Sequence, residues 1–252
     1  MAKDSPSKLA RGLFILLGLL LLGAAWLWPH LPQRGPALID AGGGLTGVLT
    51  SGYAYAWVLK TPHGAALVDA GADPEGKELL AALATQGVTP EQVHTILLTH
   101  AHLDHWAAAH LFPNARLMLE PSEVPVLRGE FKLKSWVGRL TRSMARPPLP
   151  AKLEPVEDGQ VLDVDGEKVQ VIHVPGHTPG SLVFLWKDVL FTGDALIRTH
   201  NGLRPSPFIV SEDDKQARQS LRRLREVDFS RVADGHAGLT VDAHEELGDL
   251  LK

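Results

Sequence analysis

The sequence predicts one α/β domain in which two β-sheets pack together and helices cover the outside. Its 252 residues suit a single layered domain with a short appendage. Apolar residues make up 44% of the chain and charged residues 21%, which is typical of a folded domain rather than a disordered one. From Leu38 onward, two successive halves each carry antiparallel strand signals followed by helical ones. That order favours a sandwich of two sheets with outer helices.

Apolar runs and turn residues locate the elements of the first half. The expected elements are strands over residues 53–59, 65–68, 95–98 and 115–119, a helix over 74–85 and a helical turn at 89–91. The first two strands form a hairpin, because residues 60–64 between them include a proline and a glycine. The helix carries Leu79 and Leu83 on one face, and Gly87 ends it.

The second half shows the same kinds of strand, turn and helix signals. The expected elements are strands over residues 160–164, 168–174, 181–186, 189–191 and 231–233, and helices over 211–225 and 242–251. Asp165-Gly166 is a strong signal for a two-residue turn between the first two of these strands. Ser211 and Asp214 resemble a capping box that opens the longer helix.

The N-terminal segment, residues 1–28, predicts a membrane-spanning helix that anchors the chain. Three basic residues precede an uncharged apolar run of 17 residues from Gly12 to Trp28, which favours a span with the N-terminus inside. The first alternative is a cleaved signal peptide with an apolar core at Leu13–Leu22 and a small-residue site at residues 23–25. A buried helix of the soluble domain is the second. The anchor places a membrane-attached folded domain outside the cytoplasm, whereas the cleaved signal predicts a secreted one.

The remaining chain divides into a linker and one folded domain. Residues 29–37 carry three prolines and a glycine, so they are expected to form the linker. Residues 38–252 form the predicted domain. A net charge of −4 gives no basis for a nucleic-acid partner. The chain lacks cysteine, which excludes thiol nucleophiles and thiolate metal sites. The sequence does not indicate an oligomeric state.

A dense group of metal-binding side chains follows the expected strand at residues 95–98. His100, His102, Asp104 and His105 fall within six residues, which is too many ionisable side chains for a core loop. In extended backbone, His100 and His102 point the same way and can hold one ion. Asp104 and His105 lie where the chain turns, and they can serve another. Imidazole and carboxylate are the ligands that zinc accepts when no thiolate is present.

Three further candidate ligands lie at the ends of later strands. His177 follows the strand at residues 168–174, Asp194 follows the one at 189–191, and His236 follows the one at 231–233. Each has a glycine directly before it, and each signal is weak alone. At the ends of successive strands of an apolar sheet, the three reinforce one another.

This order of motifs, His-x-His-x-Asp-His followed by the glycine-flanked His177, Asp194 and His236, resembles the metallo-β-lactamase superfamily in its hydroxyacylglutathione-hydrolase-like branch. The resemblance extends from about Tyr53 to His236 and implies a four-layer αββα sandwich. It implies a first metal site of His100, His102 and His177, a second of Asp104, His105 and His236, and a bridging Asp194. Asp69 would orient the ligand loop.

The family resemblance also implies the chemistry. It predicts two divalent metal ions, zinc first, with iron or manganese as alternatives, and a metal-bridging hydroxide that attacks an ester, thioester, lactone or phosphoester bond of a small-molecule substrate. Asp104 would be catalytic by holding and relaying the proton. A mononuclear iron oxygenase similar to the persulfide dioxygenases is one alternative. A non-catalytic, membrane-anchored metal-binding module is another.

A basic insertion over residues 128–150 is the expected specificity element. Its basic residues are Arg128, Lys132, Lys134, Arg139, Arg142 and Arg146, against the single acid Glu130. Apolar residues from Leu133 to Met144 share one helical face. The segment is a helix with a solvated basic face, a cap over the metals or a contact with anionic lipid. Arg198, His200 and Arg204 either line the mouth of the site or lie on a surface loop.

Overall fold

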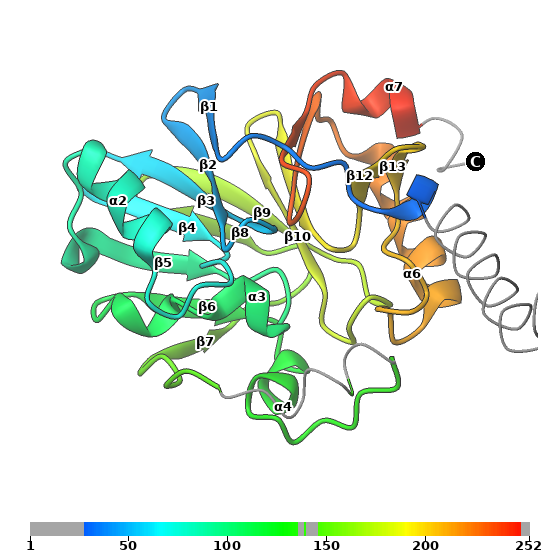
Figure 1. The fold of residues 1–252 in the computed structure, drawn as a ribbon, viewed down its shortest axis with the longest axis horizontal. Coiled ribbons are helices and arrows are strands. Elements are labelled where there is room, and N and C mark those ends of the chain that lie inside the picture. Colours follow the sequence, from blue (N-terminus) through cyan, green and yellow to red (C-terminus); the bar gives the residue numbers. More distant parts are fainter. Residues whose placement is uncertain (1–27, 136–138, 140–145, 248–252) are drawn as a thin grey trace, which may run out of the picture.

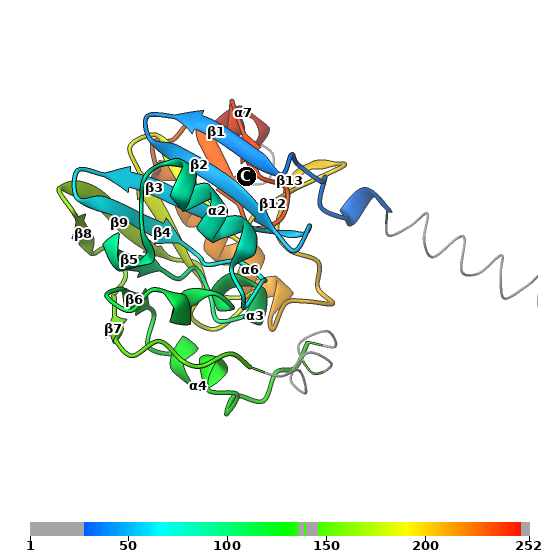
Figure 2. The ribbon, with the colours of Figure 1, turned by 60° about the vertical axis from the view of Figure 1, so that its left-hand side comes forward.

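The computed structural model describes residues 28–135, 139 and 146–247, and it confirms the sandwich (Figure 1). A seven-stranded sheet in the order β1 to β7 packs against a six-stranded sheet in the order β15-β14-β11-β10-β9-β8. A separate hairpin, β12-β13, lies beside the second sheet. In Figure 2, α2 and α3 cover one side of the sandwich and α6 lies on the other side.

The first sheet positions the four candidate ligands that lie close together in the sequence: His100 and His102 follow β5 in a loop, and Asp104 and His105 lie in the short helix α3 after it. Its strands are β1 (Leu38–Gly42), β2 (Leu45–Thr50), β3 (Ala54–Thr61), β4 (Gly64–Val68), β5 (Val93–Leu97), β6 (Arg116–Leu119) and β7 (Leu153–Pro155). Its helices are α2 (Lys77–Thr85), η2 (Pro90–Gln92), α3 (Leu103–Trp106), η3 (Ala109–Leu111) and α4 (Glu123–Leu127). Strands β4, β5 and β6 run parallel, so their carboxyl ends meet at one edge.

The second sheet brings the later candidate ligands to the same edge of the sandwich. Its strands are β8 (Val161–Val164), β9 (Glu167–His173), β10 (Leu182–Trp186), β11 (Val189–Gly193), β14 (Arg231–Asp234) and β15 (Leu239–Thr240). The remaining elements are η1 (Trp28–His30), β12 (Ile197–Thr199), β13 (Gly202–Arg204), α6 (Asp214–Leu221), η4 (Arg222–Glu226) and α7 (Ala243–Leu247). Strands β11 and β14 run parallel, which puts Asp194 and His236 at neighbouring strand ends.

Three apolar clusters separate the four layers. One lies between the sheets, where Trp57 of β3 meets Phe191 of β11 with ring centroids 6.1 Å apart. A second joins the outer face of the first sheet to its helices and includes Leu79 and Leu83, as the helical periodicity predicts. The third joins the second sheet to α6, η4 and α7 and includes Leu221. Fixed burial on both faces of each sheet holds the strand ends in register for the site.

Two helix starts differ from the sequence prediction. The first helix begins at Lys77 rather than at residue 74, because the Asp73 carboxylate accepts hydrogen bonds from the backbone of Glu75 and Lys77 in a preceding turn. The predicted capping box of Ser211 and Asp214 is wrong. Asp213 is the N-cap instead, and its side chain accepts from the Gln216 backbone N–H.

The expected linker, residues 29–37, lies against the domain. The backbone N–H of Gln33 donates to the Arg198 carbonyl over 2.9 Å, and Pro32 pairs with Thr199 in an isolated bridge. The hydroxyl of buried Tyr55 donates to the Pro36 carbonyl. These contacts attach the segment to β12 and β3.

Several predictions fall outside the described residues. The expected membrane span lies there except for Trp28, as does most of the predicted helix of the basic insertion, at residues 136–138 and 140–145. The end of the helix expected at 242–251 also lies outside, although α7 begins it at Ala243. Among the residues that the structure describes, no helix has the length and apolar character needed to cross a membrane.

Candidate metal centre

The loop after β5 is held in place by a buried carboxylate at the end of β4. Asp69 is 2% exposed, and its oxygens accept from the backbone N–H of Thr99 at 2.8 Å, the Thr99 hydroxyl at 2.8 Å and His105 Nδ1 at 2.7 Å. Because Nδ1 of His105 faces Asp69, its Nε2 faces the other candidate ligands. Asp69 therefore contacts both Thr99 and His105, as expected of the orienting residue that the family resemblance implies.

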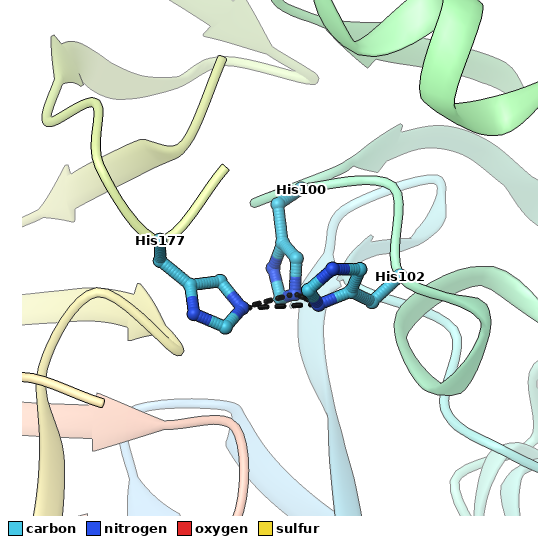
Figure 3. Close-up of side chains that lie close together, drawn as sticks. All are labelled: His100, His102 and His177. Carbon is cyan, nitrogen blue, oxygen red and sulfur yellow. Dashed lines mark hydrogen bonds between the residues drawn. The ribbon is translucent and has the colours of Figure 1, made fainter. Parts of the chain in front are cut away.

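His100, His102 and His177 form the first group, in which ring nitrogens converge (Figure 3). His100 Nε2, His102 Nδ1 and His177 Nε2 are 3.0 to 3.2 Å apart. Tetrahedral zinc with Zn–N bonds of about 2.0–2.1 Å separates its ligand nitrogens by roughly 3.3 Å. The three nitrogens thus surround a point at which one such ion fits.

Burial keeps the first group neutral. It lowers the pKa of His100 well below its usual value, lowers that of His102, and with the charge of His102 lowers that of His177 to about 3. Neutral imidazoles with free lone pairs are what a cation requires. The Thr99 hydroxyl lies 3.2 Å from His100 Nδ1 and donates to Asp69, so it can accept the Nδ1 proton and leave Nε2 as the free ligand atom.

The second group consists of Asp104, His105 and His236. Asp104 Oδ2 lies 3.9 Å from His105 Nε2 and 3.7 Å from His236 Nε2. The His236 ring is oriented by its Nδ1, which donates to the Tyr53 carbonyl at 2.6 Å, and by stacking on the Tyr53 ring. The remaining nitrogen, Nε2, faces Asp104 and Asp194.

Asp194 lies between the two groups. Its Oδ2 is 3.1 Å from His236 Nε2 and 3.6 Å from His177 Nε2, and its Oδ1 is 3.3 Å from His105 Nε2. Burial opposes its charge, but the charges of His236 and His105 hold the pKa of Asp194 well below its usual range. An ionised carboxylate thus faces both groups.

Two buried polar atoms between the two groups indicate that a cation fits there. His105 Nε2 and Asp194 Oδ1 are buried and form no hydrogen bond of good geometry within the described part of the chain. Buried polar atoms without partners are costly, and a cation between these two would satisfy both. Gly235 leaves room for them, because a Cβ there would lie 2.7 Å from Asp194 Oδ1. The donor set therefore fits metal ions in both groups.

The model of the metallo-beta-lactamase superfamily matches residues 49–236. The chain belongs to this superfamily. Among curated relatives, a probable metallo-hydrolase of Methanocaldococcus jannaschii is 24% identical, with 64% of this chain and 65% of that protein aligned. The hydroxyacylglutathione hydrolase GloC of Haemophilus influenzae is 33% identical over 41% of this chain and 50% of the enzyme. The chain spans less than two thirds of the length of each of these relatives.

Two solved structures extend the likeness over most of the metallo-beta-lactamase domain. TTHA1623, solved in a di-iron-bound form, is 32% identical with a TM-score of 0.61, covering 79% of this chain and 96% of that one. A metallo-beta-lactamase family protein from Thermus thermophilus is 25% identical with a TM-score of 0.63, covering 86% and 78%. The family and its fold, expected from the motifs, are thus confirmed.

The predicted mouth residues lie on or beside the β12–β13 hairpin of this metallo-beta-lactamase domain. Arg198 pairs with Glu246 at 2.6 Å and contacts Gln33, and Arg204 donates to the Leu203 carbonyl. His200 lies in the exposed turn between the strands.

The basic insertion contacts the domain near the first group. The backbone N–H groups of Lys134 and Ser135 donate to the Glu212 carboxylate at 2.6 and 3.2 Å. The N–H of Glu212 in turn donates to the His177 carbonyl at 3.0 Å. The start of the insertion is therefore linked to the His177 loop, as a cap would require.

Sequence reasoning missed Glu123, which joins the two loops of the first group. Its side chain is 1% exposed at the start of α4. One carboxylate oxygen accepts from the Ala101 N–H, between His100 and His102, and the other accepts from the Gly180 N–H in the His177 loop, both at 2.7 Å. Without a neighbouring motif, no local signal marks this residue.

Metal loading of the metallo-beta-lactamase domain is expected to depend on pH at the second group alone. Burial opposes protonation of His105 and His236, but Asp194 raises the pKa of both, that of His236 to about 9 in the metal-free protein. A metal ion must displace these protons, so affinity rises at least about tenfold per pH unit until pH passes about 9. At the first group, the lowered pKa of His177 leaves no proton to displace at neutral pH. Zinc titration against a chelating dye between about pH 6 and 9 tests this; two equally pH-dependent sites would contradict it.

Asp69→Asn is expected to lower zinc affinity and hydrolysis about 10- to 100-fold, because the amide cannot accept from both His105 and Thr99. Asn tolerates the left-handed backbone that Asp69 adopts at φ 57°, so the change tests the carboxylate and not the turn. Asp165→Asn, at φ 54° in a distant hairpin, is the matched control. Zinc affinity equal in both variants would contradict the orienting role.

Proposed function

We propose that this chain is a binuclear metal-dependent hydrolase. The observation that carries the proposal is the position of Asp194, whose oxygens lie 3.1 to 3.6 Å from His105, His177 and His236. One ion would be held by His100, His102 and His177, and a second by Asp104, His105 and His236. Asp194 would serve both. A single ion needs only one of these groups, so their number favours two ions over the mononuclear iron oxygenase.

Bound divalent metals supply Lewis acidity and lower the pKa of coordinated water toward neutrality. The residues of the chain orient and hold the reacting groups. Asp69, Thr99 and Tyr53 fix three imidazoles by hydrogen bonds to their far nitrogens. Asp104 is the proton acceptor in this proposal. Its side chain is 24% exposed, so one face of the carboxylate meets solvent and can pass a proton on.

Thioesters are the first substrates to test, ahead of lactones, other esters and phosphoesters. Two relatives support this order: the hydroxyacylglutathione hydrolase of Haemophilus influenzae and an atrochrysone carboxyl ACP thioesterase of Aspergillus fumigatus, the latter 27% identical over 68% of this chain. Zinc is the first metal proposed. Iron is the alternative, supported by the di-iron form of TTHA1623.

We also propose that the N-terminal segment anchors the chain in a membrane, with the catalytic domain outside the cytoplasm. The basic flank before Gly12 and the uncharged run to Trp28 support this orientation. A reporter fused after Lys252 should then be active only outside the cytoplasm. Mature protein that begins near residue 26 would favour a cleaved signal and a secreted enzyme instead.

The deciding experiment combines metal analysis with a substrate panel. The purified chain is expected to hold about two metal equivalents and to hydrolyse at least one of a thioester, a lactone, an ester and a phosphodiester. Removing the metals with a chelator should abolish the activity, and adding zinc should restore it. A chain with two metal equivalents that hydrolyses none of the four would contradict the proposal. One iron with oxygen consumption would favour the oxygenase.

A further inference from the structure

The chain enters the described domain beside the β12–β13 hairpin. The bridge of Pro32 to Thr199 and the hydrogen bond of Gln33 to Arg198 fix the entering segment there. His30, two residues after the end of the apolar run at Trp28, lines a pocket of about 360 Å³ on this face. Two residues span at most about 7 Å, so this pocket lies next to the point where the run ends.

The pocket and its rim combine apolar and basic side chains. We call its lining the Phe208 surface: His30, Thr199, Arg204, Pro205, Pro207, Phe208, Ile209 and Arg218. Phe208 is 62% exposed, a large value for a phenylalanine, and nearby Leu31 is 45% exposed. Phe208 adjoins Pro205, Pro207 and Ile209 in this lining, and contiguous exposed apolar groups rimmed by polar residues mark protein or membrane interaction sites.

The charge of the Phe208 surface is positive. Arg204 donates one hydrogen bond to the Leu203 carbonyl, and Arg218 pairs with Asp214 at 3.0 Å while remaining largely exposed. Basic side chains beside an exposed aromatic are suited to a membrane interface, where the ring enters the headgroup region and the cations meet phosphates.

We propose that the Phe208 surface contacts an anionic phospholipid bilayer, the one into which the N-terminal run inserts. The inference rests on the proposed membrane anchor. Two facts favour a bilayer as the partner of this surface. The apolar run of 17 residues ends within two residues of the pocket, and the rim of the pocket is basic. A second copy of the chain has a net charge of −4, but it lacks the phosphate groups that the headgroups of a bilayer present to these arginines.

This orientation puts the bilayer beside the metal centre. The segment that carries Phe208 also carries Ser206 and Ser211. Ser206 donates to the Asp194 carbonyl at 2.5 Å, and the Ser211 hydroxyl lies 3.4 Å from His177 Nδ1. One loop thus contacts the membrane with Phe208 and two candidate metal ligands with its serines.

The absence of cysteine permits a direct test on the full chain. Phe208→Cys is labelled with an environment-sensitive dye and placed in liposomes of phosphatidylglycerol and phosphatidylcholine. Val161→Cys is the matched control: Val161 is 60% exposed and lies in β8, at the end of the molecule opposite to the entering segment (Figure 2). Both side chains are exposed, so neither change should alter folding, which equal metal content would verify.

Lipids with a spin label in the acyl chain should quench the dye at position 208 several-fold more than at 161. Arg204→Gln with Arg218→Gln should reduce that quenching in anionic liposomes toward its value in phosphatidylcholine alone. Equal quenching at the two positions, in protein that floats with liposomes, would overturn this inference and leave the anchor intact. Failure to float would overturn both. A dye at 208 shielded from water but not quenched would indicate a protein partner and overturn the inference.

Discussion

Asp194→Asn is expected to remove one metal ion and to lower hydrolysis by about a thousandfold, since several kcal/mol of charge stabilisation are lost. The ionised carboxylate faces His105, His177 and His236, and an amide has neither its charge nor two equivalent oxygens. The chain should retain one ion at the first group, whose three nitrogens do not depend on Asp194 for their mutual geometry.

The measurement is metal content by mass spectrometry beside turnover of the best substrate from the panel. Asp213→Asn is the control, because asparagine caps a helix as well as aspartate does and the Asp213 side chain accepts from the Gln216 backbone N–H at the start of α6. Folding is checked by the unfolding transition of the metal-free proteins. Two metal ions and undiminished turnover in Asp194→Asn would refute the binuclear mechanism.

The ligand positions could be predicted because each follows a strand of recognisable sequence. His100 to His105 come after an apolar run, and His177, Asp194 and His236 each stand after a strand and a glycine. The strand ends then converge through the sheet order, in which β4, β5 and β6 run parallel and β11 pairs with β14. Local sequence patterns therefore predict the positions of site residues when those residues directly follow strands.

Other features depend on tertiary contacts that no local pattern encodes. The hairpin β1–β2 turns on Gly42, Gly43 and Gly44, all with positive φ, and β1 is largely exposed, so it lacks an apolar alternation. Ser211 looked like a helix cap, but its hydroxyl lies near His177, and Asp213 caps the helix. Arg198 pairs with Glu246 of α7, which is distant in sequence, so the partner of its side chain could not be predicted from neighbouring residues.

Glu123→Ala is expected to lower the free energy of unfolding by about 2–6 kcal/mol, because two buried N–H groups lose their acceptor at about 1–3 kcal/mol each. That is a large part of a typical stability of about 5–15 kcal/mol. The donors belong to Ala101 and Gly180, on the loops that carry His100, His102 and His177. Without the carboxylate these loops are no longer joined, so zinc affinity at the first group should fall at least about tenfold.

Glu123→Gln separates this joining role from simple occupancy of the space. Glutamine has nearly the same volume but one acceptor oxygen, so it can serve only one of the two N–H groups and presents a donor to the other. It should lie between wild type and Glu123→Ala in both unfolding free energy and zinc affinity. Glu78→Ala, on the exposed face of α2, is the control and should change neither. Chemical unfolding of the metal-free proteins and zinc competition with a chelating dye measure the two effects. A carboxylate that sets the distance between the two histidine loops cannot be removed without changing the metal site. If zinc affinity therefore stays at the wild-type value in Glu123→Ala while stability falls, Glu123 supports the fold alone.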